Sequence, residues 1–264
     1  MKTGISTASL FGRYNTEDAV SFLSEAGVAA AEVFLESFCE YNGEFGRLIK
    51  ENKGDMKIHS VHVLTTQYEP QLYSLNQRAK DDSFKILNEA MSAAREINAE
   101  YYTFHGGARF KKTPITIDFE RVGAITREIM NVTEKYGVKL AYENVHWGYY
   151  NYIGFFSALK KYAPGLKATL DIKQARQSGI DYSRFIEEMG GDIVTVHLSD
   201  VDETGKMCLP GSGITDFYDL FKRLRDVGFD GALLLEVYKS DFENTGQLID
   251  SLGFITETAR KVFA

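Results

Sequence analysis

The feature that most constrains the fold is an alternation of short apolar segments with longer helical patterns, repeated along the whole chain. Glycine marks most of the predicted helix ends, as at Gly27, Gly137 and Gly228. The strands are predicted at residues 3–7, 30–35, 57–63, 101–105, 138–143, 167–171, 193–197 and 232–236. The helices are predicted at residues 16–26, 44–52, 74–98, 118–136, 155–162, 181–190, 215–228 and 249–262. Eight such repeats predict parallel strands that close into a barrel.

The length and composition are compatible with one barrel. The 264 residues are 44% hydrophobic, which is enough for a large core, and α/β barrels of this size are commonly one domain. We find no linker rich in proline, glycine or serine, so residues 1–264 are predicted to form a single domain with a (β/α)₈ TIM-barrel fold. The alternative fold for this pattern is an open doubly wound sheet. It would need a glycine-rich phosphate turn after its first strand, and residues 4–12 contain no GxGxxG motif.

The charge balance argues against a protein that binds nucleic-acid backbones. The net charge is −7 and the pI is near 5.4, whereas such proteins need a basic face. Cys39 and Cys208 form no CxxC motif, which favours a reducing compartment over a disulfide scaffold. Residues 1–7 lack the apolar core of a signal peptide, and no run approaches the roughly 20 apolar residues that span a bilayer. We therefore expect a cytoplasmic protein with no nucleic-acid or membrane partner.

Four successive predicted strands end on residues that can bind a metal ion. An isolated buried charge is costly unless it is paired or bound to a metal, and the carboxyl ends of barrel strands form the face where active sites lie. Strand alternation places all four side chains inside the barrel, with their apolar neighbours facing the helices. Taken singly, each carboxylate would more often be a helix cap or a surface ion pair. Their shared position and parity favour one metal site, formed by Glu143, Asp171, His197 and Glu236.

Further residues with suitable chemistry lie near the same predicted face. His62 and His105 end the third and fourth predicted strands, whereas His59 has the opposite parity and is expected to face the helices. Taken alone, His62 would more often be a hydrogen-bonded core residue. Trp147 follows the fifth strand and could pack against a sugar, although simple packing is the more common role of a lone tryptophan. Gln174 follows Asp171 by three residues and could bond a hydroxyl group.

The chain resembles the xylose-isomerase-like TIM-barrel superfamily over essentially its whole length. This superfamily contains sugar (phosphate) isomerases and epimerases, such as ketose 3-epimerases and inosose isomerases, as well as inosose dehydratases and endonuclease IV. The resemblance lies in Tyr142-Glu143-Asn144, Thr169-Leu170-Asp171-Ile172, Val196-His197-Leu198-Ser199-Asp200, Pro210-Gly211-Ser212-Gly213 and Leu235-Glu236-Val237. It implies that Glu143, Asp171, His197 and Glu236 hold one divalent ion, and that Glu143 and Glu236 also act as the catalytic acid/base pair.

The chain also departs from the patterns of that superfamily. Ketose 3-epimerases and endonuclease IV usually carry a histidine three residues after the aspartate, where this chain has Gln174. Endonuclease IV also needs Asp-x-His near the position of Gly211-Ser212-Gly213, so a three-zinc cluster is not predicted. His62 and His105 match other zinc ligands of that nuclease, which leaves a second ion open. In the isomerases these strand ends line the substrate pocket.

The predicted function follows from this donor set. Three carboxylates and one imidazole suit Mn²⁺, Mg²⁺, Co²⁺ or Zn²⁺. The resemblance implies a metal-dependent isomerase or epimerase of a small carbohydrate, in which the ion polarises a carbonyl, a glutamate removes the α-proton and an enediolate forms. Three alternatives stay open: an inosose-dehydratase-like lyase, an endonuclease IV-like phosphoesterase and a barrel that only binds sugar. Self-association into a homo-oligomer is also left open.

The identity of the carbohydrate, and whether it is phosphorylated, is not predicted. Five cations lie in predicted loops or at helix starts, where they could meet a phosphate group, although such residues are more often solvated surface. They are Arg109, Lys111, Lys112, Lys173 and Arg176.

Overall fold

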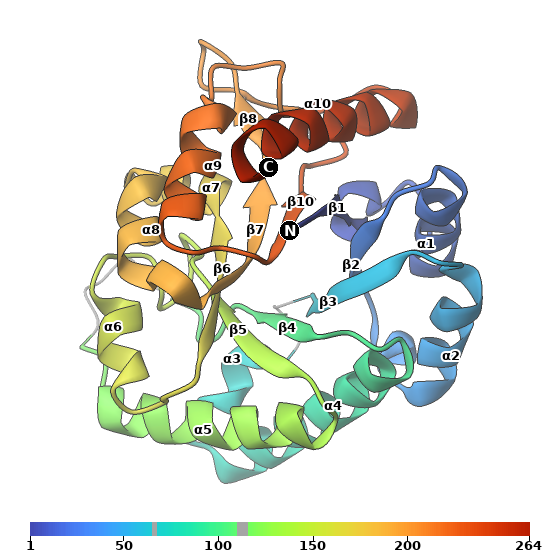
Figure 1. Cartoon of the computed structure of the whole chain (residues 1–264). Coiled ribbons are helices and arrows are strands. Elements are labelled where there is room, and N and C mark those ends of the chain that lie inside the picture. Colours follow the sequence, from blue (N-terminus) through green and yellow to red (C-terminus); the bar gives the residue numbers. More distant parts are fainter. Residues whose placement is uncertain (65–67, 110–115) are drawn as a thin grey trace.

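The structure is a computed structural model that describes residues 1–64, 68–109 and 116–264. The barrel strands are β1 (Lys2–Ser6), β2 (Ala30–Leu35), β3 (Lys57–Val63), β4 (Tyr101–Phe104), β5 (Lys139–Glu143), β6 (Lys167–Asp171), β7 (Ile193–Leu198) and β10 (Ala232–Leu235). They are all parallel and close in the order β1-β10-β7-β6-β5-β4-β3-β2 (Figure 1). The predicted barrel fold is confirmed.

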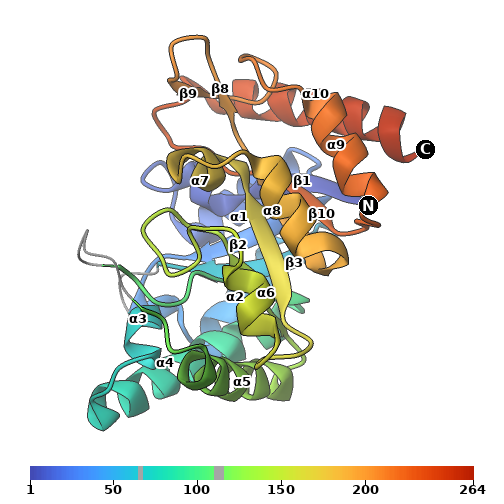
Figure 2. The same ribbon diagram turned by 90° about the vertical axis from the view of Figure 1, so that its left-hand side faces the viewer.

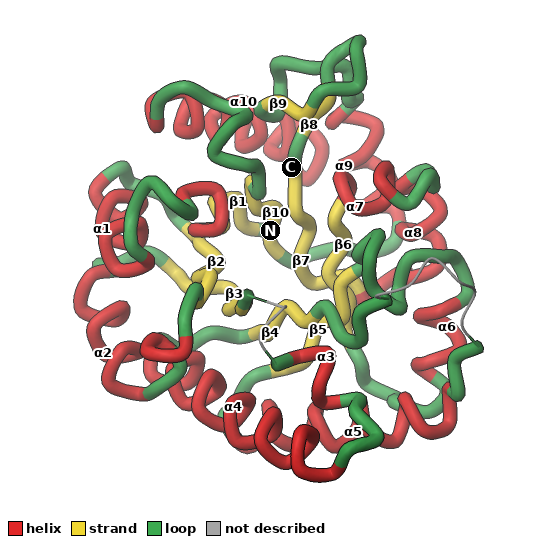
Figure 3. The backbone as a smooth tube through the Cα atoms, turned by 180° about the vertical axis from the view of Figure 1, so that it is seen from behind, coloured by secondary structure: helices red, strands yellow, loops and turns green. Residues whose placement is uncertain are grey.

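The helices form a ring around the strands, which Figure 3 shows from the opposite side. They are α1 (Thr16–Glu25), α2 (Gly43–Asn52), α3 (Glu69–Leu72), α4 (Gln77–Glu96), α5 (Phe119–Lys135), α6 (Phe155–Lys160), α7 (Ile172–Gln177), α8 (Tyr182–Met189), α9 (Phe217–Asp226) and α10 (Thr245–Phe263). Short 3₁₀ turns are η1 (Thr7–Leu10), η2 (Phe38–Glu40) and η3 (Gly190–Asp192). The chain begins and ends on the same side of the molecule (Figure 2). In the part of the chain that the structure describes, no helix is both long and apolar enough to cross a membrane.

The apolar side chains between strands and helices form the core, as the predicted alternation requires. Tyr142 of β5 is fully buried, and its ring centroid lies 5.5 Å from that of Phe155 in α6. The next residue, Glu143, instead points into the barrel, where its Oε1 atom lies 3.1 Å from His197 Nδ1 of β7. Adjacent residues of β5 therefore face opposite sides of the sheet, which confirms the predicted parity of this strand.

Two short helices, α3 and α7, were not predicted, and neither was the hairpin of β8 (Asp200–Val201) and β9 (Met207–Cys208). Segments this short show no periodicity that a sequence pattern could detect. Local hydrogen bonds define them instead. The Asp171 carboxylate caps α7 by accepting a hydrogen bond of 2.8 Å from the Gln174 backbone N–H. The Asp200 carboxylate accepts hydrogen bonds from the backbone N–H groups of Gly213 and Thr215 and so holds the loop that follows the hairpin.

His59 does not face the helices, so that prediction was wrong. Its Nε2 atom lies 3.0 Å from both the Val194 carbonyl oxygen and the Thr195 hydroxyl of β7. Because β7 is not a neighbour of β3 in the sheet, this contact crosses the barrel interior. The cause is a register irregularity between β2 and β3, where Ala31 pairs with Ile58 and the next residue pairs with Ser60. His59 is the extra residue of this bulge, which breaks the strict alternation.

Candidate active site

The four predicted metal ligands converge at the carboxyl ends of their strands. His197 Nδ1 lies 3.1 Å from Glu143 Oε1, 3.2 Å from Glu236 Oε2 and 3.9 Å from Asp171 Oδ2. One donor atom of each side chain lies within 4.8 Å of the others. We call these four residues the ligand cluster. All four are buried, so the cluster lies inside the barrel mouth and not on its surface.

Neighbouring strands hold the ligand cluster in register. Asp171 pairs directly with His197 between β6 and β7, and the Glu236 backbone N–H donates to the Leu198 carbonyl oxygen. Asn144 follows β5 and extends its pairing with β6. Its side-chain amide donates to the Asp171 carbonyl oxygen and accepts from the Asp171 backbone N–H, both at 2.8 Å. The sheet thus fixes where each ligand enters the barrel.

The carboxylates of the ligand cluster have buried oxygen atoms without a hydrogen bond from a described residue, as a cation site would. Among the described residues, no hydrogen bond reaches Glu143 Oε2, Asp171 Oδ2 or Glu236 Oε2, although all three atoms are buried. Buried polar atoms are normally paired, and several carboxylates gathered away from water repel one another. A divalent ion would satisfy these oxygens. The donor set of carboxylates and one imidazole suits Mn²⁺, Mg²⁺, Co²⁺ or Zn²⁺.

The two glutamates of the ligand cluster have unequal proton affinities. Burial raises the pKa of Glu143 to about 7, with a further contribution from the nearby charge of Asp171. Burial also acts to raise the pKa of Glu236, but the positive charges of His197, His62 and Lys173 leave it below its ordinary value. Two carboxyl groups with separated pKa values can provide one proton donor and one acceptor at the same pH.

A buried carboxylate on β2, Glu32, contacts the ligand cluster from inside the barrel and was not predicted. Its oxygens accept hydrogen bonds from Ser6 at 3.1 Å, Ser60 at 2.7 Å and Thr103 at 2.6 Å, and Oε1 lies 3.0 Å from His197 Nε2. Burial opposes its ionisation, but the charge of His197 outweighs this, and the pKa of Glu32 lies well below its ordinary value. A lone glutamate within the apolar segment 30–35 was the available sequence signal.

His62 and His105 lie beside the ligand cluster, as predicted. Their Nε2 atoms are 2.8 Å apart, and His105 Nε2 is 3.2 Å from Glu143 Oε2. His105 Nδ1 lies 3.1 Å from Glu69 Oε2, and the Tyr102 hydroxyl donates to the other oxygen of Glu69. Burial raises the pKa of Glu69 to about 8. Glu69 was missed because it lies on the short helix α3, whose position no sequence pattern indicated.

A cavity of about 300 Å³ opens next to the ligand cluster. The four residues predicted to bind substrate all line it, namely His62, His105, Trp147 and Gln174. Phe34 and Tyr238 add aromatic surface to its wall. The Trp147 ring centroid lies 5.5 Å from that of His105. The side-chain oxygen of Gln174 accepts a hydrogen bond from the His146 backbone N–H at 3.1 Å. A cavity that combines aromatic walls with several polar groups suits a carbohydrate.

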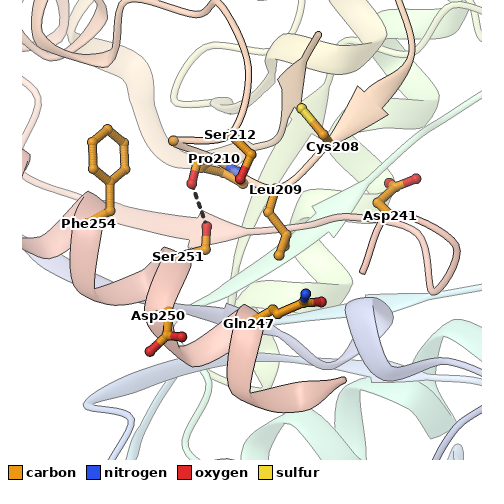
Figure 4. A pocket seen from close by; sticks show the side chains of 10 residues that line it. Cys208, Leu209, Pro210, Ser212, Asp241, Gln247, Asp250, Ser251 and Phe254 are labelled. Atoms are coloured by element: carbon orange, nitrogen blue, oxygen red, sulfur yellow. Dashed lines mark hydrogen bonds between the residues drawn. The ribbon is translucent and has the colours of Figure 1, made fainter. Parts of the chain in front are cut away.

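A second cavity, of about 360 Å³, lies between the loop after β9 and α10 (Figure 4). Asp241, Asp250 and Cys208 line it, and the Ser251 hydroxyl donates to the Pro210 carbonyl oxygen at 2.8 Å, which ties α10 to the loop. None of the predicted site residues lines this second cavity. The barrel mouth is therefore the candidate active site.

The five cations considered as phosphate ligands lie in different surroundings. Arg109 donates to the Asn151 side chain at 3.2 Å, and Arg176 is exposed. Lys111 and Lys112 lie outside the described residues. Lys173 is buried and lines the cavity of the barrel mouth.

Known proteins share this fold and part of this sequence. An uncharacterized protein of Methanocaldococcus jannaschii, MJ1311, is 23% identical over 180 residues, which are 62% of this chain and 59% of that protein. The chain thus matches less than two thirds of that relative's length. A D-tagatose 3-epimerase-like protein superposes with a TM-score of 0.77 and 19% identity over 100% of both chains. The IolI protein with a bound zinc atom superposes with a TM-score of 0.78 and 15% identity, again over 100% of both chains.

At these identities the two superpositions show a common fold. The sequence pattern of one family extends over nearly the whole chain, because its model matches residues 20–258. These residues include every member of the ligand cluster. The chain therefore belongs to the xylose isomerase-like TIM barrel family.

Proposed function

We propose that this protein is a divalent-metal-dependent isomerase or epimerase of a small carbohydrate, either a ketose, an inosose or a sugar phosphate. The observation that carries the proposal is the convergence of Glu143 and Glu236 with Asp171 and His197 beside one cavity. The fold shared with a D-tagatose 3-epimerase-like protein and with zinc-bound IolI supports it.

The ligand cluster supplies both metal ligands and acid/base groups. Glu143, Asp171, His197 and Glu236 would hold the ion, which when bound supplies a Lewis acid that polarises the substrate carbonyl. One of the two glutamates takes the proton from the carbon next to that carbonyl. The other returns a proton on the opposite face or to the neighbouring carbon.

The residues of the cavity wall would position the sugar. The Trp147 ring offers an apolar face to C–H groups of the substrate. His62, His105 and Gln174 line the same cavity and offer hydrogen bonds to hydroxyl groups. Such contacts hold the reacting carbon within reach of the glutamates, which is a large part of what an active site contributes.

Two other reactions fit parts of this site. A dehydratase would begin with the same proton abstraction and then expel a β-hydroxyl group. A phosphoesterase is favoured by one specific observation, because His62, His105 and Glu143 also form a group that could hold a metal ion. Hydrolysis of that kind uses two or more ions, so metal stoichiometry separates it from the isomerase.

The experiment that tests the proposal is proton exchange with solvent. The Mn²⁺-loaded protein is incubated in deuterated water with ketoses and inososes, with and without phosphate, and the products are analysed by mass spectrometry. We expect one deuterium in the product of at least one substrate, with no change in elemental composition. A product lighter by one water identifies a lyase. The absence of exchange from every compound, together with hydrolysis of a phosphodiester by protein that binds several ions, would contradict the isomerase.

A further inference from the structure

Lys173 is a buried cation in the candidate active site that the proposed chemistry does not yet use. It is the second residue of α7, and its side chain is only 4% exposed. A lysine in the first turn of a helix is opposed by the helix dipole, and a buried ammonium group is costly without a compensating partner. A solvated surface lysine would need no special explanation, but the buried position of Lys173 does.

The two carboxylates nearest to Lys173 balance its charge but lie too far away to accept its hydrogen bonds. Its Nζ atom lies 3.9 Å from Asp171 Oδ2 and 4.0 Å from Glu236 Oε1, which is close enough for charge attraction but too far for a hydrogen bond. The ring of Tyr238 lies on another side, with its centroid 4.4 Å from Nζ. Among the described residues, neither ion-pair partner thus uses the three N–H donors of this ammonium group.

The donors of Lys173 are placed for a ligand held by the ligand cluster. Lys173, Glu236 and Tyr238 line the same cavity. Since Nζ lies about as close to Asp171 as to Glu236, an oxygen atom bound beside these carboxylates would come within its reach. A group several bonds away from the reacting carbons, such as a distal phosphate, would lie farther from Nζ.

We propose that Lys173 is a catalytic residue that donates a hydrogen bond to the substrate oxygen on which negative charge develops. The inference rests on the proposed function. When the base takes the α-proton, the electron pair of the C–H bond forms a carbon–carbon double bond, and the π pair of the carbonyl moves to its oxygen. Lys173 keeps its proton and stabilises this enediolate oxygen through a charge-assisted hydrogen bond.

The test compares Lys173→Met with Arg176→Met, which removes the same charge from an exposed position of the same helix. Calorimetry measures the affinity of each Mn²⁺-loaded protein for glycolohydroxamate, a planar anion that resembles an enediolate. Metal content is measured in parallel, together with kcat and KM for deuterium exchange. Lys173→Gln provides a second variant if the methionine variant does not fold.

We expect Lys173→Met to bind the hydroxamate at least about tenfold more weakly, with full metal content. The kcat should fall by a similar factor and KM should change little, because the negative charge forms only after proton abstraction. Arg176→Met should behave like the wild type. Unchanged hydroxamate affinity in Lys173→Met, loss of its metal, or failure of the wild type to bind the hydroxamate would each overturn the inference.

The two proposals fail in different ways. If no carbohydrate exchanges its proton but hydroxamate affinity still depends on Lys173, then the anion contact stands and the sugar assignment fails. If a carbohydrate does exchange and the affinity for hydroxamate does not depend on Lys173, then the sugar assignment stands and Lys173 only balances the charge of Asp171 and Glu236.

Discussion

The buried carboxylate of Glu32 and the three carboxylates of the ligand cluster differ in how many hydrogen bonds their oxygens accept. Glu32 lies midway along its strand and accepts three hydroxyl hydrogen bonds in addition to its contact with His197. Glu143, Asp171 and Glu236 lie at strand ends, and each has a buried oxygen that accepts no hydrogen bond from a described residue. A satisfied carboxylate stabilises the folded protein. A cluster with unsatisfied oxygens costs stability, which is expected at a ligand-binding site.

Replacing a predicted metal ligand should have the largest effect on this comparison. We expect Asp171→Asn and His197→Gln to lose metal and proton exchange together. The affinity for the metal ion should fall by more than the roughly 10–100-fold that follows from loss of a residue that contacts a ligand but not the ion. Elemental analysis after dialysis and the deuterium assay measure the two effects. The exposed Asp226→Asn serves as the control. Retention of both metal and exchange in Asp171→Asn would remove it from the ligand cluster.

The second prediction concerns the satisfied carboxylate. Glu32→Gln removes the carboxylate that lies 3.0 Å from His197 Nε2 and turns an amide N–H₂ toward hydroxyl donors, so we expect a loss of about 3–5 kcal/mol in the free energy of unfolding. Chemical denaturation of the metal-free protein measures this. Glu203→Gln, in an exposed turn, is the matched control. A change as small as that of the control would show that Glu32 has no stabilising role.

The third prediction is that Glu143, unlike Glu32, does not stabilise the metal-free protein. Its pKa of about 7 in the folded protein exceeds the ordinary value of 4.5, so its ionisation costs stability as the pH rises between these values. At pH 8, Glu143→Gln should therefore leave the metal-free protein as stable as the wild type or more stable. Metal binding should weaken only partly, while turnover falls by at least about 10²-fold, the contribution of one acid/base group.

Measurements at saturating Mn²⁺ separate the two roles of Glu143. If exchange stays near normal in both Glu143→Gln and Glu236→Gln, the two glutamates are ligands only. The catalytic base would then have to be another residue, and His62 and His105 are the nearest alternatives.

The convergence of the four residues in the ligand cluster could be predicted because it depends on local features of each strand. Strand alternation and the position of a residue at a strand end fix which way a side chain points and at which end of the barrel it lies. That rule was sufficient for the convergence of Glu143, Asp171, His197 and Glu236. It failed at His59, where a bulge in the pairing of β3 with β2 turned the ring into the barrel. Bulges depend on the neighbouring strand, so the sequence of one strand does not reveal them.

The sequence by itself thus determined the alternation of the barrel strands with helices, the closed barrel and the convergence of the four predicted metal ligands, because these follow from periodicity and residue type along the chain. Only the tertiary structure decided which charges surround that cluster. Glu32, Glu69 and Lys173 come from a strand interior and two short helices, and their burial becomes visible only when distant segments pack together. The physical reason is that desolvation and charge pairing depend on distances in space, which the spacing of residues in a sequence does not specify.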